Sequence, residues 1–230
     1  MADEPLAFSP DQFSGNARLF PLPNLVMFPH VMQALHIFEP RYRALFEEAI
    51  EDDRLIALGS LAPGWEGSYE GRPPLRPHAC LCRIATHQRT DEGTYNVLVL
   101  GVRRLRLIRE LPPKKLFRVV ESELVDDIEP EDAGGARAAV LQRELLDAFK
   151  RSMPSVPDAH EQLDQLLGSP ITLGMLTDIV AYTLDIDVDT KLRLLAECNV
   201  VERTSTLLAA IAARGQAAVR RTFPPDFSPN

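Results

Sequence analysis

Three side chains that can bind metals alternate along one short segment of the sequence: His78, Cys80 and Cys82. On a β-strand all three would point to the same side, and imidazole and thiolate groups are common zinc ligands. The Cα atoms of His78 and Cys82 would then lie about 13 Å apart, too far for two ligands of one ion at a Zn–S distance of about 2.3 Å. We therefore predict no metal site and expect both cysteines to be buried on a strand, because free cysteine packs as a small hydrophobe.

A basic segment, GVRRLRLIRELPPKK, is the second candidate for chemistry. Its cations could contact nucleic-acid phosphates, and they include Arg103, Arg104, Arg106 and Arg109. No aromatic residues are interleaved for base stacking. Arg104 and Arg106 alternate with leucines, as on a solvated sheet face or in a salt-bridged seam with acidic helices. RNA binding through these arginines is therefore the alternative function, and nucleic acid is not the partner we expect.

Residues with catalytic potential do not form a recognisable set. The histidines and serines are scattered, and no serine lies in the G-x-S-x-G pattern of a nucleophile elbow. The neighbouring carboxylates Glu47 and Glu48 would point apart on a helix, which argues against shared acid–base work. We expect no catalytic residue and no cofactor, and we predict that the chain is not an enzyme. A hydrolase would need a metal or a perturbed pKa that the sequence does not display.

Composition places the chain among globular proteins. It has 230 residues, 45% of them hydrophobic, which is enough to bury a substantial core. The net charge of -8 disfavours a main role in neutralising phosphates. Three cysteines make no disulfide framework and suit a reducing compartment. The N-terminus lacks the apolar stretch of a signal peptide, and no apolar run approaches the roughly 18 residues of a membrane span. We therefore expect a cytoplasmic protein without a membrane partner.

The first half of the sequence predicts strands around one helix. Short apolar runs bounded by prolines predict strands at 24–28 and 33–37, and an apolar run predicts another at 54–61. The spacing of Tyr42, Leu45 and Phe46 predicts a helix over 40–51. A turn at Gly93 joins two long strand-like segments into an antiparallel hairpin, and a further strand is expected at 116–125. Such a set favours a closed or nearly closed antiparallel barrel.

The second half changes to helical periodicity. We predict helices at 131–152, 158–167, 171–184, 188–198 and 201–221, with Asp187 and Asn199 as N-caps. Asn199 and Glu202 have the spacing of a capping box. The predicted class is α+β, with a β domain at 14–128 and a helical bundle at 129–221.

Three stretches in the same order resemble the Lon protease N-terminal (substrate-binding) domain family. They are LFPLPNLVMFPHVMQALHIFEPRYRALFEEAI, HACLCRIATHQRTDEGTYNVLVLGVRRLRLIREL and LTDIVAYTLDIDVDTKLRLLAECNVVERTSTLLAAI. Ordered agreement of several motifs is more specific than one short pattern. The resemblance implies a PUA-like β fold. The chain departs from a full Lon protease because it has no G-x-x-x-x-G-K-[ST] nucleotide loop, so it looks like a stand-alone Lon domain.

This resemblance implies that the chain binds unfolded or client polypeptides. A protease or ATPase acting in trans would be a further partner, and self-association is a third possibility. As peptide-binding residues we predict Met32, Phe38, Trp65 and Tyr69, in loops and in a cleft between the two halves. The competing interpretation places the first two in the core and folds the two loop aromatics over the barrel mouth.

Overall fold

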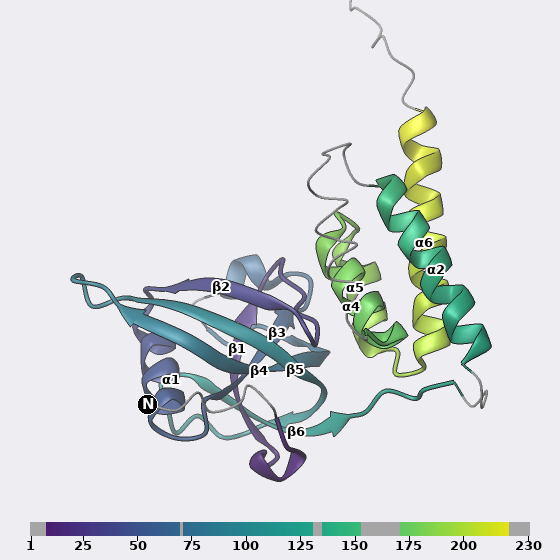
Figure 1. Ribbon diagram of the computed structural model, residues 1–230. Helices are drawn as coiled ribbons and strands as arrows, with labels where there is room; N and C mark the ends of the chain where they lie inside the picture. Colours follow the sequence, from purple (N-terminus) through teal and green to yellow (C-terminus); the bar gives the residue numbers. More distant parts are fainter. Residues whose placement is uncertain (1–7, 70, 131–134, 153–170, 221–230) are drawn as a thin grey trace, which may run out of the picture.

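The computed structural model describes residues 8–69, 71–130, 135–152 and 171–220, and the side chains as far as Arg214. Strands and one helix come first, followed by helices (Figure 1). The strands are β1 Asn16–Leu22, β2 Met32–Ile37, β3 Leu55–Leu61, β4 Leu75–Arg89, β5 Tyr95–Glu110 and β6 Arg118–Val125. The helices are α1 Pro40–Glu51, α2 Ala136–Ser152, α4 Leu173–Thr183, α5 Val188–Ala196 and α6 Val200–Arg220, with short 3-10 turns η1 Pro10–Gln12 and η2 Trp65–Ser68.

Five of the strands close into a barrel. The sheet order is β2-β5-β4-β3-β1-β6, and an additional β5–β6 pairing joins the two sides. The long strand β5 makes this possible, because its first half pairs with β2 and its second half with β6. All neighbours are antiparallel except β1 and β3, which run parallel. Closure leaves β2 as an extra strand outside the barrel, paired with β5 alone.

The barrel strands bury side chains on both of their faces. One hydrophobic cluster consists of buried residues from β1, β3, β4, β5 and β6, among them Leu19, Leu81 and Leu105. The other face packs against α1 and against the 24–31 segment through residues such as Phe28 and Phe46. This explains why β3 is buried along its whole length and reads as a continuous apolar run instead of an alternating one.

Gly101 is the point where the 24–31 segment comes closest to the sheet. The Gly101 amide donates to the carbonyl of Val31 at 2.9 Å, and the His30 amide donates to the carbonyl of Gly101 at 2.8 Å. A Cβ atom at Gly101 would lie 2.9 Å from the carbonyl carbon of Phe28 and closer still to its oxygen. The close backbone approach therefore requires glycine at this position of β5.

The helical half packs beside the barrel and shares its core (Figure 1). Buried residues of α2, α4, α5 and α6, such as Leu145, Val180 and Leu207, belong to the same cluster as α1 and the barrel. Between the halves, the Ile128 amide donates to the carbonyl of Cys198 at 2.8 Å. The amide of Val200 in turn donates to the carbonyl of Ile128 at 3.1 Å, so the segment 126–130 that follows β6, the connecting segment, is fixed to the start of α6.

Most of the predicted elements are present. The α+β class is confirmed, the helix over 40–51 has the predicted bounds, and the hairpin turns at Gly93. Asp187 caps α5 by accepting from the Thr190 amide at 2.8 Å. Asn199 caps α6 by accepting from the Glu202 amide at 3.1 Å, which is half of the expected capping box. In the other half, the Asn199 amide donates to the Glu197 carboxylate at 2.8 Å instead of to that of Glu202.

One strand prediction is wrong. Residues 24–28 form no strand, although Val26, Met27 and Phe28 are buried, and the first strand is instead β1. An apolar run signals burial, whereas a strand also requires backbone pairing, and the backbone bonds of this part of the chain to the sheet come later, between His30, Val31 and Gly101. The helix predicted at 158–167 lies outside the described residues.

Candidate functional site

The two predicted site residues flanking the extra strand are exposed. Met32 begins β2 and is 49% exposed, and Phe38 follows β2 and is 62% exposed. Neither side chain is in the core. Since a strand rises about 3.3 Å per residue, they lie at opposite ends of β2, about 20 Å apart. Phe38 stacks against His36, with ring centroids 6.2 Å apart.

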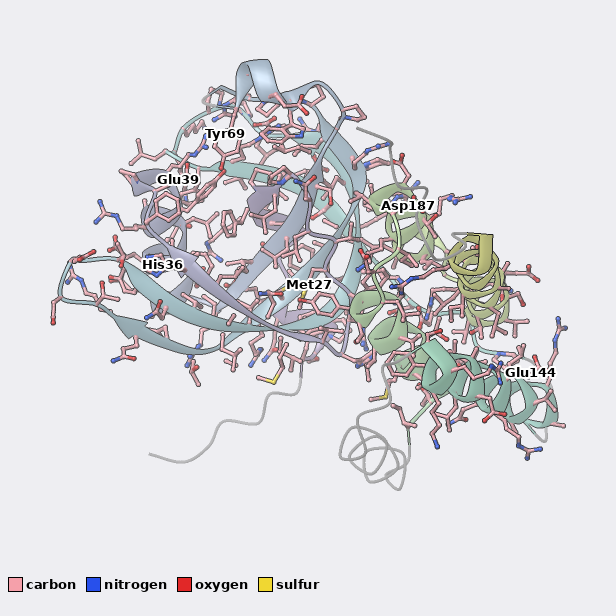
Figure 2. The ribbon with its side chains drawn as sticks, turned by 90° about the horizontal axis from the view of Figure 1, so that it is seen from above. Met27, His36, Glu39, Tyr69, Glu144 and Asp187 are labelled. Atoms are coloured by element: carbon pink, nitrogen blue, oxygen red, sulfur yellow. The ribbon has the colours of Figure 1, made fainter. Side chains whose placement is uncertain are left out.

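The two predicted loop aromatics contact each other. The rings of Trp65 and Tyr69 meet edge to face with centroids 5.6 Å apart, and both side chains are half-buried. The Tyr69 hydroxyl donates to Glu39 at 2.9 Å, which ties the loop to the residue after Phe38. Glu39 and Tyr69 lie at the same end of the barrel in Figure 2. The structure thus brings Trp65 and Tyr69 together, whereas Phe38 is linked to them only through its chain neighbour Glu39 and Met32 lies at the other end of β2.

Arg41 strengthens this junction between loop and helix. Its guanidinium carbon lies 4.9 Å from the ring centroid of Tyr69 and 4.7 Å from that of Tyr42, within the range of cation–π attraction. The guanidinium also forms an ion pair with Glu39 at 2.8 Å. Burial raises the pKa of Tyr42 and of Tyr69, and the bond to Glu39 raises that of Tyr69 further. Both phenols therefore remain neutral at pH 7, and Tyr69 acts as a hydrogen-bond donor.

Behind Tyr69 lies a pocket of about 210 Å³, which we call the aromatic–arginine pocket. Its apolar lining includes Tyr42, Tyr69, Leu116 and Phe117, and its charged lining consists of Arg41, Arg72 and Arg118. Leu116 is 73% exposed at its edge. An exposed large apolar side chain beside a concave, aromatic-walled pocket is a typical anchoring arrangement for a partner.

The predicted basic strand is paired throughout. Arg103 lies 3.6 Å from Asp126, Arg106 contacts Glu123, and Arg109 lies 2.6 Å from Glu121. The sequence allowed Arg104 either a solvated sheet face or a salt bridge with the helices. Arg104 is buried and forms the salt bridge. These four cations do not form a free basic face, and Arg104 cannot reach a phosphate at the surface.

Arg104 belongs to a buried ion network between the barrel and the helices. It reaches Asp178 of α4 through both terminal guanidinium nitrogens, one of them at 3.0 Å, and it reaches Asp127 at 3.2 Å. Arg203 of α6 contacts Asp127 at 2.5 Å and Asp178 at 3.4 Å. The side chains of Asp178 and Arg203 are fully inaccessible. Two cations thus balance two anions, and the network holds α4 and α6 to β5 and to the connecting segment.

The cleft between the halves is consequently charged. A pocket of about 350 Å³ opens beside this network, and its lining includes His30, Arg103, Asp126 and Glu129. Burial lowers the pKa of His30, so its imidazole is neutral at pH 7. An apolar peptide bound in the cleft would remove water from these charged groups and would offer them no polar partner in return. The cleft does not match the apolar binding surface that we predicted there.

The alternating His78, Cys80 and Cys82 lie on β4 with both thiols buried. Burial raises the pKa of Cys80, which keeps this thiol protonated. Within the described ranges, no group of three or more histidine, cysteine or acidic side chains could hold a metal ion. The buried position of the two thiols is therefore as predicted.

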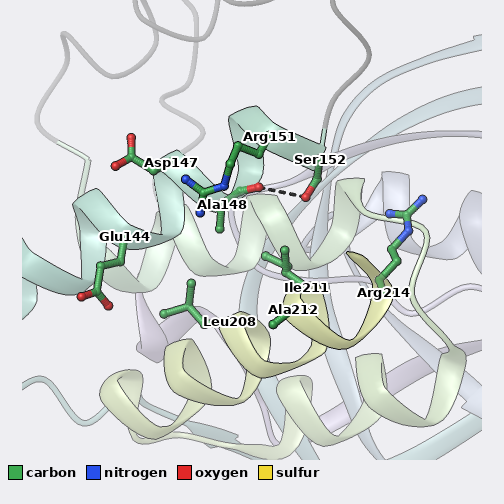
Figure 3. Close-up of a pocket in the computed structure, with 9 residues that line it drawn as sticks. All are labelled: Glu144, Asp147, Ala148, Arg151, Ser152, Leu208, Ile211, Ala212 and Arg214. Carbon is green, nitrogen blue, oxygen red and sulfur yellow. Dashed lines mark hydrogen bonds between the residues drawn. The ribbon is translucent and has the colours of Figure 1, made fainter. Parts of the chain in front are cut away.

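A further pocket, of about 770 Å³, lies between α2 and α6 (Figure 3). Ala148, Leu208 and Ile211 form its apolar part, and Ser152 at its edge donates to the Ala148 carbonyl at 2.8 Å. It is on the helical half, at the side of Glu144 in Figure 2, away from Tyr69. Residues 153–170 follow Ser152 directly and lie outside the described part of the chain.

Comparison with known families matches residues 16–213 to one family model. This model is described as the ATP-dependent protease La (LON) substrate-binding domain. The chain belongs to this family. Its fold agrees with a Lon N-terminal domain protein from Xanthomonas campestris at a TM-score of 0.58, with 22% identity, covering 84% of this chain and 97% of that one. It also agrees with the N-terminal domain of Mycobacterium avium complex Lon protease at a TM-score of 0.65, with 19% identity, covering 86% and 98%.

Relatives in sequence are longer than this Lon-family chain. The Lon protease of Anaeromyxobacter dehalogenans is 26% identical over 195 residues, which are 83% of this chain and 22% of the relative. Lon protease 2 of Myxococcus xanthus is 26% identical over 194 residues, again 83% and 22%. The chain therefore spans about a fifth of the length of these proteases and matches their substrate-binding part. None of its described helices is both long enough and apolar enough to cross a membrane.

Sequence reasoning missed the other half of the aromatic–arginine pocket. Leu116 and Arg118 are distant in sequence from the loop aromatics and meet Tyr69 only because β6 closes the barrel, whereas Arg72 follows Tyr69 closely in the same loop. The segment LPPKKLF does carry a local signal, since two prolines and two lysines would normally leave a following leucine exposed.

Proposed function

We propose that this Lon-family chain binds apolar segments of unfolded or client polypeptides, without catalysis and without ATP. The observation that carries the proposal is the exposed apolar side chain of Leu116 at the edge of the aromatic–arginine pocket, together with exposed Phe38, which precedes the Tyr69 partner Glu39. Partners are held mainly by a few apolar and aromatic anchors at pocket edges. Membership of a substrate-binding domain family supports the same role.

Partners follow from this role. Clients are polypeptides with exposed apolar residues, and a protease or ATPase acting in trans would receive them. A second copy of the chain would compete for the same apolar surface. A cytoplasmic location is supported by the three free cysteines. Binding is expected to be weak, because ordering a flexible segment offsets much of the gain from burying its side chains.

Light scattering of an aggregating client tests the proposal. Reduced, unfolded lysozyme is diluted into buffer without ATP, with and without a stoichiometric excess of the chain, at two salt concentrations. Apolar binding should suppress scattering at both. The double substitution Phe38→Ala and Leu116→Ala should remove most of the suppression, because it truncates exposed anchors without emptying the core.

A matched control removes an apolar side chain of similar exposure elsewhere. Val140 lies on α2 and is 52% exposed, and it is not part of the barrel surface. Val140→Ala should retain full suppression. Absence of suppression by the unmodified chain at any ratio would contradict the proposal, and equal loss in the control would contradict the location of the site.

A further inference from the structure

The aromatic–arginine pocket adjoins a second pocket. This second pocket has a volume of about 300 Å³ and is lined by the 111–115 turn together with Val119 and Asn16. Arg72 and Phe117 line both pockets and therefore form a shared wall. The two pockets therefore adjoin at Arg72, each with apolar as well as charged lining, and we call the pair the Arg72 groove. A groove of two pockets suits an extended segment better than a single side chain.

Charge at the shared wall is unbalanced. Arg118 uses its guanidinium fully, because it donates to Glu110 at 3.0 and 2.6 Å and to the Pro73 carbonyl at 2.8 Å. Arg72 contacts the same Glu110 oxygen that accepts from the Nε of Arg118. Two guanidinium groups thus share one carboxylate. Among the residues that the structure describes, Glu110 is the only carboxylate in contact with Arg72.

The other charges around the groove do not cancel this excess. Arg41 is balanced by Glu39, and Lys115 is paired with Glu48 at 2.5 Å. Lys114 lines the second pocket and has no ion-pair partner within the described part of the chain. Glu70 lies outside the described residues. Among the residues that the structure describes, the cations around the groove therefore outnumber their carboxylate partners, although the whole chain has a net charge of -8.

We propose that the Arg72 groove selects client segments in which an acidic side chain is flanked by apolar ones. This inference rests on the proposed function and specifies its substrate class. The carboxylate of the client would bind the part of the Arg72 guanidinium group that Glu110 does not contact. Its apolar neighbours would enter the two pockets against Phe117 and Leu116.

The spacing of the segment follows from strand geometry. In an extended chain, side chains on one face are two residues apart, or about 6.6 Å. The complementary pattern is therefore apolar, any residue, acidic, any residue, apolar. Arg72 has a side chain 35% exposed, and Arg118 behind it is only 10% exposed. A carboxylate at this wall would thus be partly shielded from water, which strengthens its attraction to the guanidinium groups.

Fluorescence anisotropy with short synthetic peptides tests the selection. The peptides are acetylated and amidated, carry leucine two positions on either side of the central residue, and have serine elsewhere. Their central residue is glutamate, glutamine or lysine. We expect the glutamate peptide to bind about fivefold more tightly than the glutamine peptide, and the lysine peptide to bind most weakly. Raising the salt concentration should reduce this preference.

Substitutions locate the preference. Arg72→Gln should abolish the difference between glutamate and glutamine peptides, and Arg72→Lys should retain most of it. Arg106→Gln is the matched control, since Arg106 is an exposed cation with one acidic partner and lies outside the groove. It should leave the difference unchanged.

The outcomes separate the two proposals. Equal binding of the glutamate and glutamine peptides would overturn the inference while leaving apolar polypeptide binding intact. Failure of every peptide to bind would overturn both. A glutamine peptide with a free terminal carboxylate that bound as well as the glutamate peptide would also overturn the inference, because the chain end would then be the ligand.

Discussion

Replacing Asp178 with asparagine tests whether the buried ion network fastens the helices to the barrel. Asp178 lies on α4 with its side chain fully inaccessible, and it contacts Arg104 of β5 and Arg203 of α6. The substitution keeps the shape of the side chain and removes its charge. Two buried guanidinium groups would then share Asp127 alone.

The expected loss is large. Removing one partner from a buried ion pair costs about 3–5 kcal/mol, because the remaining charge stays out of water without compensation. The free energy of unfolding of a domain is about 5–15 kcal/mol, so this loss is a substantial fraction of it. With a urea dependence of about 2–3 kcal/mol per molar, the midpoint should fall by about 1–2.5 M.

Urea unfolding followed by circular dichroism measures this shift. Glu123→Gln is the control, because it breaks the exposed pair with Arg106 and should cost at most about 1 kcal/mol. The double substitution Arg104→Met and Asp178→Leu removes both charges. Its loss of unfolding free energy should be smaller than the sum of the losses of Arg104→Met alone and Asp178→Leu alone. A midpoint shift for Asp178→Asn no larger than that of the control would refute the reasoning, and so would full additivity in the double variant.

Two further predictions concern backbone approach and helix capping. Gly101→Ala should lower the unfolding free energy by about 3 kcal/mol or more. Gly67→Ala has open space around its Cβ and should change the unfolding free energy by less than about 1 kcal/mol. Thermal unfolding of both variants distinguishes these outcomes. Asp187→Ala should cost about 1 kcal/mol. The hydrogen bond from Thr190 lowers the pKa of Asp187, so the contribution of this cap is complete above the unfolded pKa of about 3.9 and is lost as the pH falls through the lower folded value. The difference in stability between Asp187→Ala and the unmodified chain should therefore shrink in acid, and a difference that is constant down to pH 2 would contradict this.

Much of the fold could be predicted because its signals are local. The helix over 40–51 follows from the spacing of Tyr42, Leu45 and Phe46, and all three are buried as that spacing requires. The caps at Asp187 and Asn199 depend on contacts within three residues. The strand prediction for 24–28 was wrong because the local sequence indicates that the segment is buried, but it does not indicate whether a partner strand is available.

The site was less predictable because its contacts are distant in sequence. Loop composition pointed to Trp65 and Tyr69; Tyr69 does line a pocket, and Trp65 packs against its ring. Nothing near them in the sequence indicates that Leu116 and Arg118 complete its lining. Arg104 was ambiguous for the same reason, since its partner Asp178 is 74 residues away and only the packing of α4 on β5 brings the two together.

The pairing of β1 with β6 has a consequence for synthesis of the chain. These strands are roughly 100 residues apart, and ribosomes add about 5–20 residues per second, so β6 emerges on the order of 5–20 s after β1. During this interval the sheet lacks the strand that closes it, and β1 offers an unpaired edge to other chains. A nascent Lon-family chain therefore passes through a state that itself resembles an incompletely folded client.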